Sequence, residues 1–378
     1  MRVLFTTTPL TGHFFPLVPL AWAFRIAGHD VLVSTSDNFV EPVLRSGLPV
    51  AATGPAADLT EIGRAGRPSE PDAVIGRRHT HGRAFARIAR QNFAGTRSLV
   101  DLWHPHLVVS ERAEFAGPLA ALAAGVPWVS YHWSVSQLPE YRDAGAEEFS
   151  AELSDLGFAG IPAPQRGLNP WPVSLRLPHA SDHLGVRHVA SSGEAPLPDW
   201  AFRTPDRPRI CVTLGTVVPR AAGDDASDFM LAMLDHLAAL DVELVVAVDD
   251  DIAARWHRLP PAVLHAGRIP FGSVLPSCAA IIHHGGQGTA LNAVAAGLPQ
   301  LVLPWFDDQF DNGMTLAESG AGLMLSPPEC TPEAVARSCA RLLADEKHTD
   351  VAATLAREMA LLPLPSAVVA HFTDLDAK

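Results

Sequence analysis

The chain has 378 residues, of which 48% are hydrophobic and 18% charged, so it can bury a large core and is long enough for two domains. This composition excludes a disordered protein. The formal net charge of −13 argues against nucleic acid and anionic lipid as partners.

The four cysteines lie far apart without a CxxC spacing, which is typical of thiols in a reducing compartment. The N-terminus has no apolar signal region, and no run approaches the ~18 apolar residues of a membrane span. We therefore expect a soluble, cytoplasmic protein with no stable membrane insertion, and a homodimer is compatible with the sequence. HxH pairs occur, but no HExxH motif or Cys/His grid joins them, so we expect no metal site.

The chain opens on a strand–helix–strand pattern. Residues 1–7 are typical of a buried parallel strand, 15–28 of a helix that ends at Gly28, and 29–35 of the next strand. The transition from an alanine-rich helix through Gly-x-Pro into a strand recurs at 44–52, 119–131 and 291–304. Glycine favours a left-handed helix stop and proline prevents continuation. The repeated alternation predicts an α/β protein with two Rossmann-like, doubly wound parallel sheets.

Residues 191–209 are rich in proline and charge and have no periodicity, which is typical of an interdomain linker. A buried strand begins again at 210–216, so we place the boundary near residue 205, with domains 1–205 and 206–378. The weakly patterned stretches 51–75 and 137–172 are expected as long loops that wall an acceptor pocket.

One short basic cluster, at 76–90, interrupts the acidic composition. Its ordinary interpretation is a solvated helix face. A contact with an anionic acceptor is the alternative.

The stretch 281–289, IIHHGGQGT, places a glycine turn between a strand and a helix. A helix N-terminus has unpaired N–H groups and a partial positive charge, so it is an anion site. The pattern lacks the spacing of GxGxxG and the lysine of a P-loop. We predict a diphosphate site formed by close backbone approach, an imidazole and a hydroxyl, from His284, Gly285, Gly286, Gly288 and Thr289.

The following strand ends in DDQFDN, residues 307–312. Ligands in open α/β sheets bind beyond the carboxyl ends of the strands. Asp308 and Gln309 therefore offer an acceptor and a donor for sugar hydroxyls next to the phosphate loop. Thr216 ends another strand at the same edge and is a candidate for a second phosphate or acceptor contact.

His13 follows the first strand, and histidine has the side-chain pKa nearest neutrality, which suits a general base. Glu111 ends another strand, with Glu114 one helical turn on. A carboxylate bonded to one imidazole nitrogen would stabilise the imidazolium formed when the other nitrogen takes a proton. The sequence does not show that these side chains touch, and capping or core packing is the alternative for His13.

Several aromatic residues lie in N-terminal segments that we expect near the acceptor. They could stack on a flat aromatic or macrocyclic acceptor, with core packing as the alternative. These residues are Phe14, Phe85, Tyr131, His132 and Trp133.

Residues 11–35 and 283–312 resemble the N-terminal and donor signatures of family-1 glycosyltransferases with the GT-B fold, particularly bacterial enzymes that attach deoxysugars to natural products. The resemblance covers nearly the whole chain. It implies two domains facing each other across a cleft, the N-terminal one for the acceptor and the C-terminal one for the nucleotide sugar. It also implies that the last helix packs back on the N-terminal domain.

The resemblance implies His13 as the base, with Glu111 in the place of its acidic partner. It implies donor contacts from Thr216, Arg268, Ile269, His284, Gly286, Gly288, Thr289, Asp308 and Gln309. Arg268 stands where the family commonly has an aromatic residue that stacks on the base, and its guanidinium plane can also stack. Glu111 replaces the more usual aspartate, which alters the reach to His13.

The implied reaction is inverting transfer of a sugar, from a nucleoside diphosphate that is expected to be thymidine diphosphate, to a hydroxyl of an aromatic polyketide or macrolide. Because fixed donors take the place of a metal at the departing phosphate, we expect no metal and no cofactor beyond the sugar nucleotide. Rigid-body closure about 191–209 would exclude water.

Other functions on the same double fold stay open. A sugar-nucleotide epimerase or hydrolase would consume donor without acceptor, and only product analysis separates C- from O-glycosylation. A non-catalytic partner of a true transferase would tolerate loss of His284 and Asp308.

Overall fold

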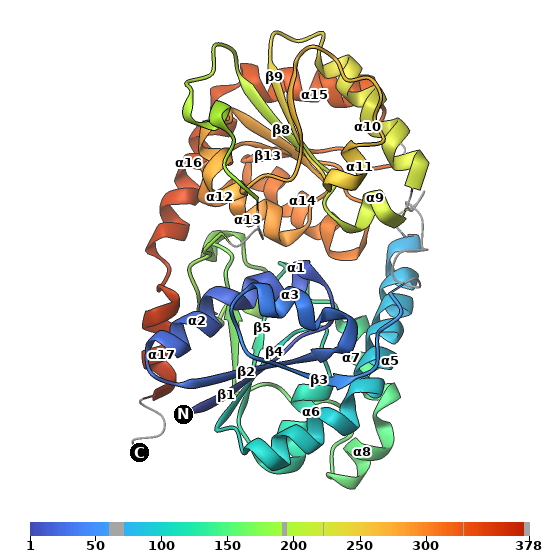
Figure 1. Cartoon of the computed structure of the whole chain (residues 1–378), viewed down its shortest axis with the longest axis vertical. Helices are drawn as coiled ribbons and strands as arrows, with labels where there is room; N and C mark the ends of the chain where they lie inside the picture. The colour runs from blue at the N-terminus through green and yellow to red at the C-terminus, as the bar shows by residue number, and fades with distance from the viewer. Residues whose placement is uncertain (60–71, 191–194, 222, 328, 374–378) are drawn as a thin grey trace. The chain divides into compact units, whose positions relative to one another are not determined.

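The computed structural model describes residues 1–59, 72–190, 195–221, 223–327 and 329–373 (Figure 1). Residues 60–71 of the expected loop 51–75 and residues 191–194 of the expected linker lie outside these ranges. The chain divides into two compact units. The first contains Met1–Ile62, Ile75–Ser191 and Leu362–Lys378, and the second is built mainly from Ser192–Leu361.

The first unit is built on a 7-stranded parallel sheet in the order β3-β2-β1-β4-β5-β6-β7. Its buried strands are apolar on both faces because helices cover both sides of a parallel sheet. The strands are β1 Arg2–Thr6, β2 Asp30–Ser36, β3 Val50–Gly54, β4 Leu107–Glu111, β5 Trp128–Tyr131, β6 Arg166–Asn169 and β7 Leu184–Gly185. The helices are α1 Thr11–Phe14, α2 Val18–Ile26, α3 Val40–Arg45, α5 Asp72–Trp103, α6 Ala116–Ala124, α7 Pro139–Glu148, α8 Ser150–Asp155 and α17 Pro365–Thr373.

The second unit is built on a 6-stranded parallel sheet in the order β10-β9-β8-β11-β12-β13. Its strands are β8 Arg209–Thr213, β9 Glu243–Ala247, β10 Val263–Gly267, β11 Ala280–His283, β12 Gln300–Val302 and β13 Gly322–Met324. Its helices are α9 Val217–Ala221, α10 Gly223–Leu237, α11 Asp250–Ala253, α12 Phe271–Val274, α13 Gln287–Ala295, α14 Asp307–Ser319, α15 Pro332–Ala344 and α16 Glu346–Leu361. The predicted α/β class with two parallel sheets is confirmed.

The Gly-x-Pro transitions behave as the sequence predicts. Gly47, Gly125 and Gly297 each follow a helix with φ of +77°, +67° and +67°, a region that favours glycine. Each leads into a strand, so the three copies mark three helix-to-sheet connections.

The last described helix, α17, belongs to the first unit and packs on α2 (Figure 1). Phe372 of α17 lies against Phe24 of α2 with ring centroids 6.3 Å apart. Within the described residues, one helical stretch, Glu346–Phe372, passes a membrane-span test by length and composition, which core helices of soluble proteins also pass.

The expectation of a loop throughout 137–172 is wrong, because α7 and α8 occupy its first half. Arg90 of α5 forms ion pairs with Glu148 and Glu152 and lies 4.0 Å from the ring centroid of Phe149. These contacts hold both short helices against α5. They also favour a structural interpretation of Arg90 in the basic cluster over an acceptor contact.

Candidate active site

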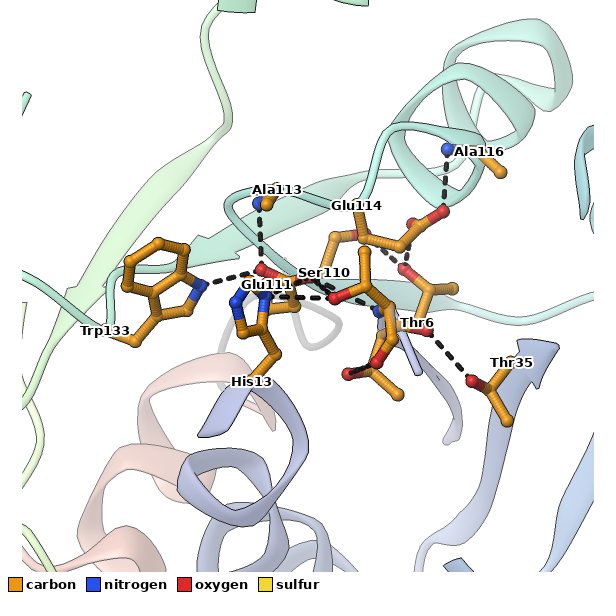
Figure 2. Close-up of polar contacts among 11 residues, drawn as sticks. Thr6, His13, Thr35, Ser110, Glu111, Ala113, Glu114, Ala116 and Trp133 are labelled. Atoms are coloured by element: carbon orange, nitrogen blue, oxygen red, sulfur yellow. Dashed lines mark hydrogen bonds and ion pairs between the residues drawn. The ribbon is translucent and has the colours of Figure 1, made fainter. Parts of the chain in front are cut away.

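His13 and Glu111 are in contact at the carboxyl ends of β1 and β4, which are neighbours in the first sheet (Figure 2). His13 Nδ1 lies 3.1 Å from Glu111 Oε1 and 2.9 Å from the hydroxyl of Thr8. The His13 side chain is 13% exposed, whereas Glu111 is fully buried. An ionised carboxylate accepts a hydrogen bond, so Nδ1 carries the proton and Nε2 has the lone pair that a base requires.

Glu111 is held by hydrogen bonds to both carboxylate oxygens. Oε1 accepts from the hydroxyl of Thr8 at 2.8 Å and from the backbone N–H of Thr8 at 3.3 Å. Oε2 accepts from Trp133 Nε1 at 2.7 Å and from the Ala113 N–H at 2.8 Å. Burial alone would raise the pKa of Glu111, but the positive charge of a protonated His13 and the hydrogen bonds from His13, Trp133 and Ala113 outweigh it and lower the pKa to about 2. The carboxylate therefore stays ionised at neutral pH.

The imidazole of His13 packs against aromatic rings. Its centroid lies 4.6 Å from that of Trp133 and 5.3 Å from that of Phe85. Both rings are buried, as are Phe14 and Tyr131 in the core around β1 and β5. Trp133 and Phe85 thus pack against the imidazole of His13, and acceptor contacts from these four residues stay a prediction.

Glu114 lies beside the His13–Glu111 pair, but its carboxyl group binds N–H groups at the N-terminus of α6 (Figure 2). Its carboxyl group accepts from the N–H groups of Ala116 and Gly117, each at 2.8 Å, and from the Thr6 hydroxyl at 2.6 Å. Burial, reinforced by the charge of Glu111, raises the pKa of Glu114 to about 7 despite these donors. Between about pH 2 and pH 7, Glu111 is therefore ionised while Glu114 is protonated.

In the second unit, the predicted phosphate loop leads from β11 into α13. Gly286 is the N-cap of α13 and provides no side-chain cap, so the first helical N–H groups have no capping side chain. A Cβ at Gly288 would meet nothing within 4 Å, and Thr289 is partly exposed. These features match an anion site at a helix N-terminus.

The imidazole of His284 lies between two glycine backbones. A Cβ on Gly215, in the turn after β8, would come within 2.5 Å of His284 Cε1, and one on Gly286 within 2.3 Å of Nε2. Only glycine at both positions admits the ring. Burial lowers the pKa of His284 to about 3, so the ring is neutral and can donate one N–H.

Polar atoms at this loop lack partners within the described part of the chain. These atoms are Nδ1 of His284 and both amide atoms of Gln287, whose side chain is 5% exposed. A buried polar group without a partner costs about 1–3 kcal/mol, which a ligand could offset. Sequence reasoning missed Gln287, although its place between two glycines of the loop singles it out.

The candidate sugar contacts lie on the first turn of α14. Asp308 is partly exposed and accepts from Asn312 Nδ2 at 3.0 Å. Gln309 is 7% exposed, and its Oε1 accepts from the N–H groups of Trp305 and Phe306 at 2.9 and 3.0 Å. The amide oxygen of Gln309 therefore shapes the turn that precedes α14.

Arg268 is held by hydrogen bonds to two aspartates. Its Nε donates to Asp249 at 3.1 Å and its backbone N–H to Asp250 at 2.9 Å, while Ile269 is buried. A pocket of about 300 Å³ is lined by Ala195, Pro196, Pro198, Asp250, His265 and Arg268. Thr216 is exposed in the turn after β8 and does not line this pocket.

Within the described ranges, no group of three or more His, Cys, Asp or Glu side chains is arranged to hold a metal ion. The four cysteines are buried free thiols.

The sequence matches the family described as erythromycin biosynthesis protein CIII-like, with the N-terminal domain at residues 22–215 and the C-terminal domain at 231–375. It is 39% identical to the L-demethylnoviosyl transferase of Streptomyces niveus over 97% of this chain and 96% of that protein. It is 32% identical to the 10-deoxymethynolide desosaminyltransferase of Streptomyces venezuelae over 100% of this chain and 98% of that protein.

Solved structures resemble the whole chain. The glycosyltransferase SsfS6 of Streptomyces sp. SF2575, complexed with thymidine diphosphate, is 32% identical with a TM-score of 0.85, and 99% of each chain is covered. The spinosyn rhamnosyltransferase SpnG, also complexed with thymidine diphosphate, is 27% identical with a TM-score of 0.88 over 99% of this chain and 100% of that one.

Proposed function

Because the chain belongs to the erythromycin biosynthesis protein CIII-like family and is a hexosyltransferase with the GT-B fold, we propose that it transfers a deoxysugar, with inversion and without a metal ion, from a thymidine diphosphate sugar to a hydroxyl of a natural-product acceptor. The observation that carries this proposal is the contact of His13 with the ionised Glu111, since deprotonation of an acceptor hydroxyl needs such a base.

The donor is assigned to the second unit. The uncapped N-terminus of α13 and the neutral His284 supply hydrogen-bond donors for a diphosphate, and Asp308 supplies an acceptor for a sugar hydroxyl. Arg268 and Ile269 are assigned to contacts with the nucleobase, and Thr216 to contacts with the phosphates. Thymine is the proposed nucleobase because the similar structures SsfS6 and SpnG are complexed with thymidine diphosphate.

In the reaction, the acceptor hydroxyl gives its proton to Nε2 of His13. The oxygen attacks the anomeric carbon as the bond from that carbon to the phosphate oxygen breaks, and the electron pair leaves with the diphosphate. A single displacement of this kind inverts the configuration. Charge grows on the departing phosphate, so donors aimed at it stabilise the transition state more than the ground state. Glu111 stabilises the imidazolium through Nδ1.

The acceptor class rests on the relatives. By their names, one relative transfers an L-demethylnoviosyl group and the other transfers a desosaminyl group to 10-deoxymethynolide. The proposed acceptor, an aromatic or macrocyclic natural product, is the one that the sequence resemblance implies. The buried free thiols accord with the proposed soluble, cytoplasmic location.

The test is His13→Ala, assayed with thymidine diphosphate sugars against aromatic and macrolide acceptors. We expect transfer to fall by about 10²–10⁴-fold, the usual contribution of a general base, while calorimetry shows unchanged binding of thymidine diphosphate. His236→Ala is the control, because His236 is an exposed histidine that only pairs with Glu333 at 3.3 Å.

Loss of nucleotide binding together with transfer in His13→Ala would indicate a structural role for His13 instead. Consumption of donor at the same rate without any acceptor would indicate an epimerase or hydrolase. Failure of the wild-type protein to bind any nucleoside diphosphate would overturn the proposal.

A further inference from the structure

Asn312 is a fully buried polar residue on α14 that connects the phosphate loop to a carboxylate. Its Nδ2 donates to the carbonyl oxygen of Gly285 at 2.9 Å and to Oδ2 of Asp308 at 3.0 Å. A side-chain amide nitrogen has two hydrogens, so one hydrogen serves each acceptor. Asp308 and Asn312 are one helical turn apart, which is the spacing at which such side chains meet.

Gly285 is tightly constrained within the loop. Its φ is +90°, and a Cβ there would lie 2.8 Å from the carbonyl oxygen of Gln309 and 2.9 Å from Val302. Its N–H donates to His283 Nδ1 at 3.1 Å, and its carbonyl accepts from Asn312. Both polar groups of this peptide residue are thus held by side chains.

His283 is suited to this arrangement because it is neutral. Burial lowers its pKa to about 4, and its Nε2 lies 2.8 Å from Oε1 of Gln300. A neutral imidazole has one donor and one acceptor nitrogen, so Nε2–H donates to Gln300 and Nδ1 accepts from Gly285. The amide of Asn312 therefore joins this loop to α14 by a hydrogen bond.

We propose that Asn312 is a positioning residue that holds the phosphate-binding loop and the sugar-binding carboxylate of Asp308 in one fixed geometry. The inference rests on the proposed function, in which the loop binds a diphosphate and Asp308 a sugar hydroxyl. The amide orients Asp308 with one hydrogen and the Gly285–Gly286 peptide, at the start of α13, with the other. Loss of the side chain should therefore affect phosphate and sugar recognition separately.

The two effects can be separated by a double-mutant cycle of Asn312→Ala with Asp308→Ala. Calorimetry gives dissociation constants for thymidine diphosphate and for thymidine diphosphate glucose, and the ratio of the two reports sugar recognition. Asn312→Ala should weaken binding of thymidine diphosphate by about tenfold, the effect of one hydrogen bond to a buried polar group, whether or not Asp308 is present. It should change the ratio by about tenfold only while Asp308 is present.

Ser319→Ala is the control for helix stability. Ser319 ends α14, where its hydroxyl donates to the Leu316 carbonyl at 2.8 Å and accepts from the Ala321 N–H at 3.2 Å. This variant should lower the melting temperature without changing either dissociation constant. Where Asn312→Ala does not fold, Asn312→Leu keeps a side chain branched at the same position, has no charge and no side-chain N–H, and gives the same comparison.

Unchanged dissociation constants in the folded Asn312 variant would overturn the inference, and so would a change in the ratio that is equally large without Asp308. Either result leaves the proposed function standing if the wild-type protein binds both ligands. Failure of the wild-type protein to bind either ligand would overturn the proposed function and this inference with it.

Discussion

Replacement of Trp133 by phenylalanine tests whether this residue supports the proposed general base, His13, or contacts the acceptor. The substitution keeps a ring against the imidazole of His13 but removes the N–H that donates to Glu111 Oε2 at 2.7 Å. Oε2 then keeps only the Ala113 N–H among the donors described above, while Oε1 keeps Thr8. The carboxylate is weakened as an acceptor but stays in place.

The expected size follows from that geometry. A hydrogen bond to a buried charged group contributes about 1.5–3 kcal/mol, and each 1.36 kcal/mol changes a rate tenfold. If the charge of Glu111 is needed in full only when His13 becomes an imidazolium, the loss appears in the transition state. We therefore expect kcat to fall by about 10- to 100-fold, with KM for the acceptor and for the sugar nucleotide nearly unchanged.

The assay is steady-state kinetics with both substrates varied, and Trp171→Phe is the matched control. Trp171 is fully buried in the same unit, and its Nε1 has no hydrogen-bond partner among the described residues. Its loss removes an indole without removing a hydrogen bond, so kcat should not change. A raised acceptor KM with unchanged kcat in Trp133→Phe would refute the reasoning and favour stacking on the acceptor.

Two further substitutions test the loop and the second carboxyl group. Gly285→Ala should lower the free energy of unfolding by about 1–3 kcal/mol, because the φ of +90° and the nearby Gln309 carbonyl both exclude a Cβ. It should also weaken nucleotide binding. Thermal unfolding compared with that of Gly288→Ala, where a Cβ meets nothing within 4 Å, checks the loss of stability. Glu114 has a folded-state pKa raised to about 7 from 4.5, so its contribution to stability is complete below the unfolded value and is lost as the pH rises through about 7. Relative to Glu114→Gln, which cannot titrate, the wild-type protein should lose about 2–3 kcal/mol of unfolding free energy between about pH 5 and 8 in urea titrations, and a constant difference would contradict this.

Local chemistry in the sequence predicted much of the fold. Glycine followed by proline marks where helices end, and apolar runs mark buried strands, because both signals depend on the backbone and side chains within a few residues. The same is true of the phosphate loop, whose glycines, imidazole and hydroxyl are adjacent in the chain. The weak periodicity of 137–172 did not predict α7 and α8. Their carboxylates Glu148 and Glu152 pair with Arg90 of α5, which is distant in sequence, so a local pattern does not reveal these contacts.

The supports of the candidate site could not be predicted in this way. Thr8, Trp133 and Glu111 meet only because β1, β4 and β5 are adjacent in the sheet, and no local pattern states which strands pair. The sequence therefore predicts Trp133 beside the acceptor, since an aromatic residue after a strand has the same sequence pattern whether it contacts a ligand or the imidazole of His13. Asn312 was passed over because its function depends on Gly285, which is distant in sequence.

The strand orders explain why each unit forms its candidate site where it does. In the first sheet the chain moves outward from β1 through β2 to β3 and then returns to place β4 on the other side of β1. In the second sheet β8 and β11 have the same relation. At such a point the connections leave in opposite directions, so the crevice beyond the two carboxyl ends stays open for a ligand.

His13 and Glu111 follow or end the strands at the first of these points, and Gly215 and His284 follow those at the second. The two candidate sites differ in the protonation states of their side chains. The positive charge of a protonated His13, together with hydrogen-bond donors, lowers the pKa of Glu111, whereas burial lowers the pKa of His284 and leaves it neutral with an N–H that a phosphate could accept. The same topology is thus compatible with the proton acceptance that we propose for one unit and the anion binding that we propose for the other, and the difference lies in a few side chains and their protonation states.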